Sequence, residues 1–263
     1  MRSAAFFDLD KTILATSSAL AFTRPFYEQG LLKRADVVKS AYRQFVFTVG
    51  GADHDQTEKM RKYLSELVDG WEVTNLDRLV RESLDDLITP TVHLEALDLI
   101  KWHQSEGREV VIVSASGQEI VEPVAELLGV DAVIATRMGI RDGRYNGGIE
   151  FYAYGENKAI AMREYAAEHA VDLTSSFAYS DSITDLPMLQ AVGNPFAVNP
   201  DSGLREVAVT QGWPVLTFEK PAALRRPIID DPEQRKQALI AASVLALVIA
   251  WVVKRRKSKG RAS

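Results

Sequence analysis

Short apolar runs alternate with longer segments along most of the chain. Continuous hydrophobic runs predict five buried strands, at residues 4–7, 110–113, 132–135, 176–179 and 196–198. The segments between them predict helices, at residues 93–105, 119–128 and 157–169. Strands that alternate with helices form βαβ units, so the sequence predicts an α/β fold with a doubly wound parallel sheet. Asp142-Gly143 and Gly147-Gly148 predict two hairpin turns after the third strand.

Residues 16–90 interrupt this alternation directly after the first strand. Apolar side chains recur there at helical spacing, as in Leu31, Leu32, Tyr42 and Phe45, so we expect a mostly helical insertion. The expected division is a core of residues 1–15 and 91–218 with a helical cap of residues 16–90. Ligands of such sheets bind beyond the carboxyl ends of the strands, where this cap would lie.

The chain ends in an apolar segment followed by basic residues. Residues 219–237 predict a linker, residues 238–253 are sixteen uncharged residues, and residues 254–263 form a basic tail. A spanning helix needs about 20 residues, so we expect a C-terminal apolar helix that crosses the membrane or lies in its interface. The alternative is a buried helix of the core. The catalytic body is expected in the cytoplasm, attached to the cytoplasmic membrane.

The charged residues are unevenly distributed along the chain. The 263 residues contain 31 basic and 36 acidic side chains, a net charge of -5, and six of the basic ones lie in the last ten residues. Without those six, 25 basic residues stand against 36 acidic ones, a balance of -11. An acidic body argues against a nucleic-acid partner. The absence of cysteine excludes disulfides, thiolate metal sites and cysteine nucleophiles.

Polar residues gather where the predicted strands end. Asp8 follows the first strand, and Asp10 and Thr12 come shortly after it. An aspartate can attack phosphorus when a cation neutralises both partners, and a second carboxyl group can move a proton on the leaving oxygen. Aspartate and threonine are also common in plain turns. Phosphoryl-transfer chemistry and an ordinary turn are therefore both open for this motif alone.

Three further groups follow later strands. Ser114 could bind a phosphate oxygen or cap a helix. Lys158 lies in a first helical turn, where a cation opposes the helix dipole, so it has a role elsewhere or is a solvated surface lysine. Asp181 and Asp185 suit a hard cation such as Mg²⁺, although Asp181 could cap a helix instead. The four groups together, each after a strand, favour a site over four separate coincidences.

This order of motifs resembles the haloacid dehalogenase (HAD) superfamily over residues 4–218. The residues DLDKT after the first strand match its first motif, VSAS its second, Lys158 its third and SDSITD its fourth. The helical insertion is similar to the C1 cap of subfamily IB, the phosphoserine-phosphatase-like branch. The resemblance implies a HAD-like Rossmannoid core and a magnesium-dependent phosphomonoester phosphatase.

The resemblance also implies a role for each matching residue. Asp8 would be the nucleophile and a Mg²⁺ ligand, and Asp10 the general acid/base, whose backbone carbonyl also binds the metal. Asp181 would ligate Mg²⁺, with Asp185 supporting it directly or through water. The phosphate-binding residues would be Thr12, Ser114, Ala115 and Lys158. An aspartyl phosphate on Asp8 would then be hydrolysed.

One departure concerns the substrate. Phosphoserine phosphatases of this branch carry a glutamate shortly after the first motif, whereas residues 15–19 contain no acid here. Phosphoserine phosphatase, a phosphotransferase to an alcohol and a non-catalytic membrane-tethered binding protein remain alternatives. Candidate substrate contacts in the cap are Arg24, Tyr42 and Arg43, which would equally suit a solvated helix face. The substrate expected is a small phosphomonoester.

Overall fold

The computed structural model describes residues 2–32, 62 and 65–219. Seven strands form one sheet in the order β4-β3-β2-β1-β5-β6-β7. All neighbouring pairs are parallel except β3 and β4. The strands are β1 (Ala4–Phe7), β2 (Glu109–Gly117), β3 (Ala132–Arg141), β4 (Arg144–Phe151), β5 (Phe177–Ser180), β6 (Asn194–Val198) and β7 (Val215–Leu216). The predicted α/β fold with a parallel-dominated sheet is confirmed.

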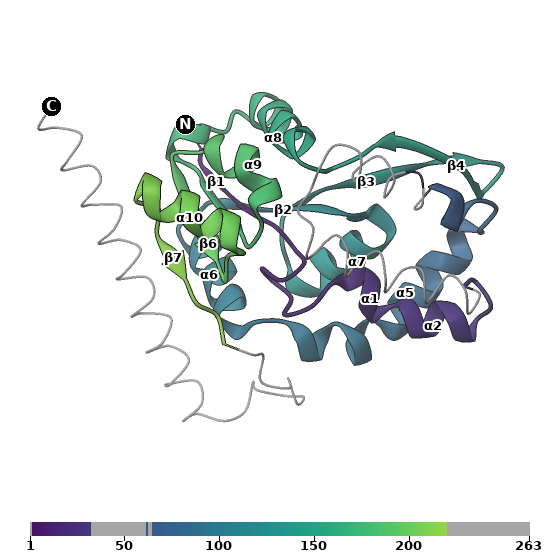
Figure 1. Ribbon diagram of the computed structural model, residues 1–263. Coiled ribbons are helices and arrows are strands. Elements are labelled where there is room, and N and C mark those ends of the chain that lie inside the picture. Colours follow the sequence, from purple (N-terminus) through teal and green to yellow (C-terminus); the bar gives the residue numbers. More distant parts are fainter. Residues whose placement is uncertain (1, 33–61, 63–64, 220–263) are drawn as a thin grey trace, which may run out of the picture.

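Helices cover both faces of this sheet (Figure 1). The longer ones are α5 (Val73–Leu87), α6 (Leu94–Ser105), α7 (Gln118–Leu128), α8 (Glu156–Glu168) and α10 (Ser202–Gln211). The short helices and 3₁₀ turns are α1 (Ser18–Ala21), α2 (Thr23–Glu28), α9 (Leu186–Gln190), η1 (Thr89–Thr91), η2 (Leu173–Ser175) and η3 (Ile183–Asp185). The three helices predicted in the core lie within one residue of their expected ends.

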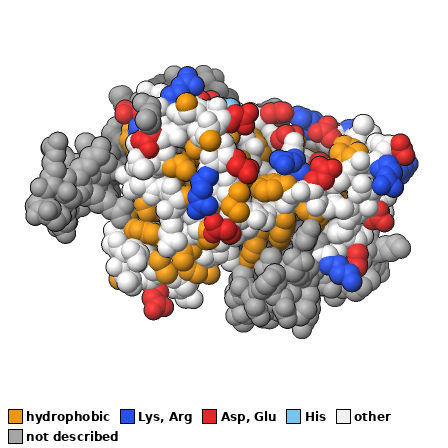
Figure 2. Space-filling model, turned by 90° about the horizontal axis from the view of Figure 1, so that it is seen from above, with side chains coloured by type: hydrophobic (Ala, Val, Ile, Leu, Met, Phe, Trp, Pro, Cys, Tyr) orange, Lys and Arg blue, Asp and Glu red, His pale blue; other side chains and the backbone are white. Residues whose placement is uncertain are grey.

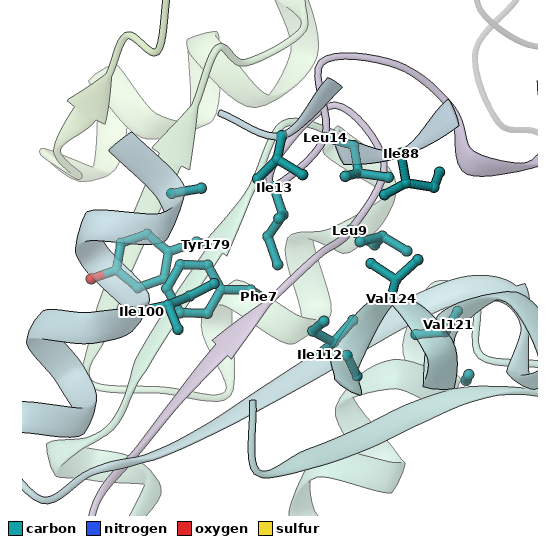
Figure 3. Close-up of a cluster of buried hydrophobic side chains, with 14 of the residues drawn as sticks. Phe7, Leu9, Ile13, Leu14, Ile88, Ile100, Ile112, Val121, Val124 and Tyr179 are labelled. Carbon is teal, nitrogen blue, oxygen red and sulfur yellow. The ribbon is translucent and has the colours of Figure 1, made fainter. Parts of the chain in front are cut away.

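Strand alternation distributes the core between the two faces of the sheet. Ala5 and Phe7 of β1 face a cluster that includes side chains of α5, α6 and α7. Ala4 and Phe6 face the other cluster, built with α8, α9 and α10. Figure 3 shows Phe7 and Tyr179 next to Ile100 of α6, with Leu9 and Ile112 near Val124 of α7. The central strand is therefore buried on both sides, which fixes where its carboxyl end lies.

The hairpin of β3 and β4 differs from the sequence prediction. The third strand was expected to end at Ala135, but it continues to Arg141 and turns at Asp142-Gly143, both with positive φ (52° and 73°). The second predicted turn, at Gly147-Gly148, is wrong, because both glycines lie inside β4. The hairpin contacts the helical insertion through an isolated bridge between Glu72 and Arg144. It therefore joins the sheet to residues assigned to the cap.

The described part of the insertion is helical in α1, α2 and α5, and α5 packs on α7 of the core. Tyr42, Arg43 and Phe45 lie outside the described residues, as do residues 220–263 with the predicted apolar segment and basic tail. Among residues 2–32, 62 and 65–219, no helix has the length and apolar character needed to cross a membrane. Membrane attachment therefore stays a prediction.

The surface seen in Figure 2 is mixed in character. Acidic, basic and hydrophobic side chains are interspersed on this face. Exposed ion pairs such as Arg163 with Glu156 join neighbouring side chains of α8. Such exposed pairs stabilise the fold by about 1 kcal/mol at most. The candidate site residues Asp8, Lys158, Asp181 and Asp185 lie instead in buried positions.

Candidate active site

The loop after β1 brings Asp8 to the carboxyl edge of the sheet. The Asp8 backbone N–H donates to the Tyr179 carbonyl of β5 (2.9 Å), so the ends of the two strands are joined there. Leu9 accepts backbone hydrogen bonds from Ile13 and Leu14, which closes a tight loop. Lys11 lies at its tip with φ of 61°, in the left-handed region that a side chain seldom occupies. Such backbone strain is often found at functional sites.

Lys158 is the centre of a buried ion cluster. Its Nζ donates to Asp8 Oδ1 (2.7 Å) and to Asp185 Oδ2 (2.8 Å). The lysine is only 2% exposed, so it is not a solvated surface lysine. Ser180 Oγ donates to the same Asp185 oxygen (2.7 Å). One ammonium group therefore joins the loop after β1 to the segment after β5.

Burial controls the charges of this cluster. Burial lowers the pKa of Lys158, but the charges of Asp185 and Asp8 outweigh this and raise it above its ordinary value. Burial raises the pKa of Asp8 well above its ordinary value, and the carboxylates of Asp185 and Asp181 add to this while Lys158 opposes it. Burial likewise raises the pKa of Asp181 to about 7, with Lys11 opposing and Asp185 adding. The site thus places three buried carboxyl groups, those of Asp8, Asp181 and Asp185, beside one buried ammonium group.

A divalent cation fits this donor set. Carboxylate oxygens are the ligands that Mg²⁺ prefers, and the Asp181 carboxylate is close enough to Asp8 to raise its pKa. The described residues contain no cluster of three acidic or histidine side chains arranged for a metal ion. The resemblance implies that Asp8, Asp181 and the Asp10 backbone carbonyl would hold the cation, with Asp185 supporting it directly or through water. Asp185 also accepts hydrogen bonds from Lys158 and Ser180.

Asp181 is not a helix cap. Ser182 caps the 3₁₀ turn η3 by accepting from Thr184 N, so the alternative of a capping Asp181 is wrong. Asp181 is 9% exposed and its Oδ1 lies 3.5 Å from Thr12 Oγ1, at the outer limit of a hydrogen bond. Thr12 itself is fully buried. The threonine and the aspartate thus join the first and fourth motifs.

Ser114 and Ala115 lie at the carboxyl end of β2, which is paired with β1. The strand continues past Ser114 to Gly117, and Gly117 is the N-cap of α7, so Ser114 does not cap that helix. Ser114 Oγ accepts from Ser116 N (3.2 Å), and the Ala115 carbonyl accepts from Thr136 Oγ1 (2.8 Å). These contacts shape the end of β2 next to the Asp8 loop.

Asp10 is held by residues that the sequence did not identify. Its carboxylate accepts hydrogen bonds from Ser17, Ser18 and Ser116. Only the pairing of β1 with β2 brings Ser116 to this loop, so spacing along the chain could not reveal it. Of the candidate cap contacts, Arg24 forms an exposed ion pair with Glu28 one helical turn away, as on a solvated helix face.

The fold and this cluster define an α/β enzyme with an aspartate at the end of its central strand. The sequence profile of the haloacid dehalogenase-like hydrolases matches residues 5–190. The chain belongs to this family, which confirms the resemblance predicted from the four motifs and the prediction of an enzyme.

Three similar proteins extend this comparison. A Streptomyces azureus protein named "Inhibition of morphological differentiation protein" is 50% identical, covering 98% of this chain and 95% of that protein. A Mycobacterium tuberculosis protein named as a probable phosphatase is 56% identical, covering 85% of this chain and 78% of its own. A solved structure described as a phospho-aspartyl intermediate analogue of phosphoserine phosphatase has a TM-score of 0.61 at 18% identity, covering 84% and 95% of the two chains. At 18% identity, the likeness to this last structure shows the fold alone.

Proposed function

We propose that this protein is a magnesium-dependent phosphomonoester phosphatase that forms an aspartyl phosphate on Asp8. The observation that carries this proposal is the buried cluster in which Lys158 contacts Asp8 at the carboxyl end of β1. A relative at 56% identity is named as a probable phosphatase, which supports the same class of reaction. A non-catalytic binding protein would not need to keep Asp8, Asp10, Lys158 and Asp181 together, which argues for catalysis.

Each residue of the cluster has a part in this reaction. Asp8 attacks phosphorus, and the Lys158 ammonium binds a phosphoryl oxygen while keeping the Asp8 carboxylate in place. Asp185 orients the lysine by accepting a hydrogen bond from its Nζ at Oδ2, and Ser180 Oγ holds Asp185 by donating to the same oxygen. Asp10 protonates the leaving oxygen and later takes a proton from the attacking water.

Mg²⁺ would be held by Asp8, Asp181 and the Asp10 carbonyl. When bound, it supplies positive charge that offsets the repulsion between the carboxylates and the phosphate. Thr12, Ser114 and Ala115 complete the proposed phosphate-binding surface. The assignment is supported by the three buried carboxyl groups of Asp8, Asp181 and Asp185 beside the single Lys158 ammonium group, since a bound cation would favour their ionised form.

We further propose that phosphoserine is not the preferred substrate. Residues 15–19 offer no carboxylate for an ammonium group, and Ser17 and Ser18 are bonded to Asp10 instead. Substrate choice is assigned to the helical cap of residues 16–90 over a core of residues 1–15 and 91–218. A phosphotransferase would share the first half of this reaction and differ only in its acceptor.

A phosphate-release screen tests the proposal. Wild type and Asp8→Asn are compared over a panel of phosphomonoesters that includes phosphoserine, with Mg²⁺ or with EDTA. The expected result is turnover that requires Mg²⁺ and is lost in Asp8→Asn. Adding an alcohol acceptor and analysing the products separates hydrolysis from phosphotransfer. Turnover that survives Asp8→Asn would overturn the proposal.

A further inference from the structure

The Asp10 carboxylate is enclosed by three serines from two separate segments. Asp10 Oδ1 accepts from the backbone N–H of Ser18 (2.9 Å). Asp10 Oδ2 accepts from Ser17 Oγ (3.2 Å) and from Ser116 Oγ (3.3 Å). Ser17 and Ser18 begin the helical insertion, whereas Ser116 belongs to the end of β2. The side chain is thus fixed from both sides.

Ser116 has contacts on three sides. Its Oγ lies 2.9 Å from Ser18 Oγ as well as 3.3 Å from Asp10 Oδ2. Its backbone N–H donates to Ser114 Oγ (3.2 Å). Ser18 is fully buried, so this pair of hydroxyl groups is shielded from water on one side. Ser116 therefore joins a proposed phosphate-binding serine to the proposed general acid.

The two oxygens of Asp10 face different kinds of partner. A backbone N–H can only donate, so Asp10 Oδ1 is an acceptor in any arrangement that keeps the Ser18 contact. A hydroxyl group can donate or accept, so Ser17 and Ser116 can stay bonded to Oδ2 whether or not that oxygen carries a proton. The three contacts can therefore hold the Asp10 carboxyl group in place whether it is ionised or protonated.

We propose that Ser116 and Ser18 are positioning residues that hold the Asp10 carboxyl group in place so that it can deliver a proton to the leaving oxygen. This inference rests on the proposed phosphatase function. In the step concerned, a bond forms between an Asp8 carboxylate oxygen and phosphorus while the bond from phosphorus to the leaving oxygen breaks. The proton of the Asp10 carboxyl group moves to that leaving oxygen, which departs as an alcohol. Asp10 is left as a carboxylate that all three serines can bond.

Leaving-group dependence tests this role. An alkoxide leaving group needs a proton, whereas p-nitrophenolate leaves as a stable anion. Ser116→Ala should therefore lower kcat/KM for an alkyl phosphate by about tenfold or more relative to p-nitrophenyl phosphate, a fraction of what a general acid contributes. Because kcat/KM reports the steps up to phosphoryl transfer, slow hydrolysis of the aspartyl phosphate does not hide the effect. Ser116→Thr, which keeps the hydroxyl group, should restore most of the alkyl phosphate activity.

Ser176→Ala is the matched control. Ser176 is fully buried, and its Oγ accepts from Ala4 N–H (3.0 Å) and donates to the Asp172 carbonyl (2.7 Å) at the opposite end of β1. Its loss should change the two substrates equally. An equal loss with both substrates in Ser116→Ala, or no loss, would overturn the positioning role.

Failure of the proposed function is distinguishable from failure of this inference. If wild type releases no phosphate from any ester, the phosphatase proposal fails. A crystal structure of Ser116→Ala then decides the positioning role by itself. An Asp10 side chain that leaves the Ser17 and Ser18 contacts is the result expected, and an unmoved Asp10 would overturn the inference.

Discussion

The Lys158 ammonium lies 2.7 Å from Asp8 Oδ1, and both side chains are buried. The second contact of Lys158, to Asp185, satisfies another of its three protons (2.8 Å). A cation in this place opposes the effect of burial on the Asp8 carboxyl group, and it can also bind an oxygen of a phosphoryl group. The pair therefore relates the stability of the fold directly to its proposed chemistry.

Removing the Lys158 side chain should lower both the stability of the fold and the phosphatase activity. Lys158→Ala leaves Asp8 and Asp185 buried without their cation, which costs about 3–5 kcal/mol when one partner of a buried pair is lost. Phosphatase turnover should fall to background in the same variant. Denaturant unfolding and phosphate release measure the two effects, with the exposed Lys101→Ala as the control. A Lys158→Ala variant with unchanged stability would contradict the buried ion cluster.

Asp181 and Asp185 should differ in their effect on the metal. Asp181→Asn removes a proposed Mg²⁺ ligand, so the Mg²⁺ concentration for half-maximal activity should rise about tenfold or more. Asp185→Asn weakens the contact with Lys158 and should lower kcat with little change in that concentration. Magnesium titrations of both variants make the comparison. A larger shift in Asp185→Asn would assign the metal to Asp185 instead.

Adding Mg²⁺ should stabilise the wild-type protein. A cation that binds only the folded state raises its stability with ligand concentration, and here it also relieves the repulsion between buried Asp8 and Asp181. The thermal midpoint should therefore rise with Mg²⁺ and return with EDTA. The rise should be absent or strongly reduced in Asp181→Asn. An equal rise in both proteins would show that the cation binds elsewhere.

His103 should make the fold sensitive to acid. Burial, with Arg108 adding to it, lowers the pKa of His103 well below its ordinary value of 6.5. Arg108 Nε donates to His103 Nδ1 (2.9 Å), so Nε2 carries the hydrogen and donates to Tyr179 Oη (2.9 Å). Below pH 6.5 the His103 side chain binds a proton in the unfolded chain but not in the folded one. This contribution to stability is complete above pH 6.5 and is lost as the pH falls toward the folded-state pKa.

The loss of stability expected from His103 in acid depends on the number of protons that the unfolded chain takes up. One proton corresponds to about 1.4 kcal/mol of unfolding free energy per pH unit. Asp8 and Asp181, whose pKa values are raised, act in the opposite direction. The slope is therefore compared between wild type and His103→Gln, which keeps the carboxylates. Unfolding measured from pH 7.5 to 5 should show a smaller loss in the variant, and identical slopes would contradict a neutral buried His103.

Local pattern was sufficient to predict much of the sheet. The runs at Ala4–Phe7 and Val110–Val113 are apolar because both faces of these strands are covered, and such runs are visible without knowledge of the fold. β7 was not predicted, since Val215–Leu216 is too short to form a pattern. The extension of β3 was not predicted because its outer part contains Arg137, Gly139 and Arg141 in place of a continuous apolar run, and it is only partly buried.

The sequence predicted which residues form the candidate site, but it did not predict the contacts between them. Lys158 was identified because a cation in a first helical turn opposes the helix dipole. Its bond to Asp185 could not be predicted, because it depends on how α8 lies against the end of β5. Serines such as Ser17 and Ser116 have many ordinary uses, so only the tertiary pairing distinguishes them. Sequence indicates which groups can react, whereas packing decides which groups orient them.

Trapping the aspartyl phosphate tests the central claim most directly. Wild-type protein turning over a phosphomonoester with Mg²⁺ is quenched and treated with borohydride, which reduces an acyl phosphate of aspartate to homoserine. Peptide mass spectrometry then locates the product. The account predicts homoserine at position 8, dependent on substrate and absent from Asp8→Asn. Homoserine at another aspartate, or none during active turnover, would contradict it.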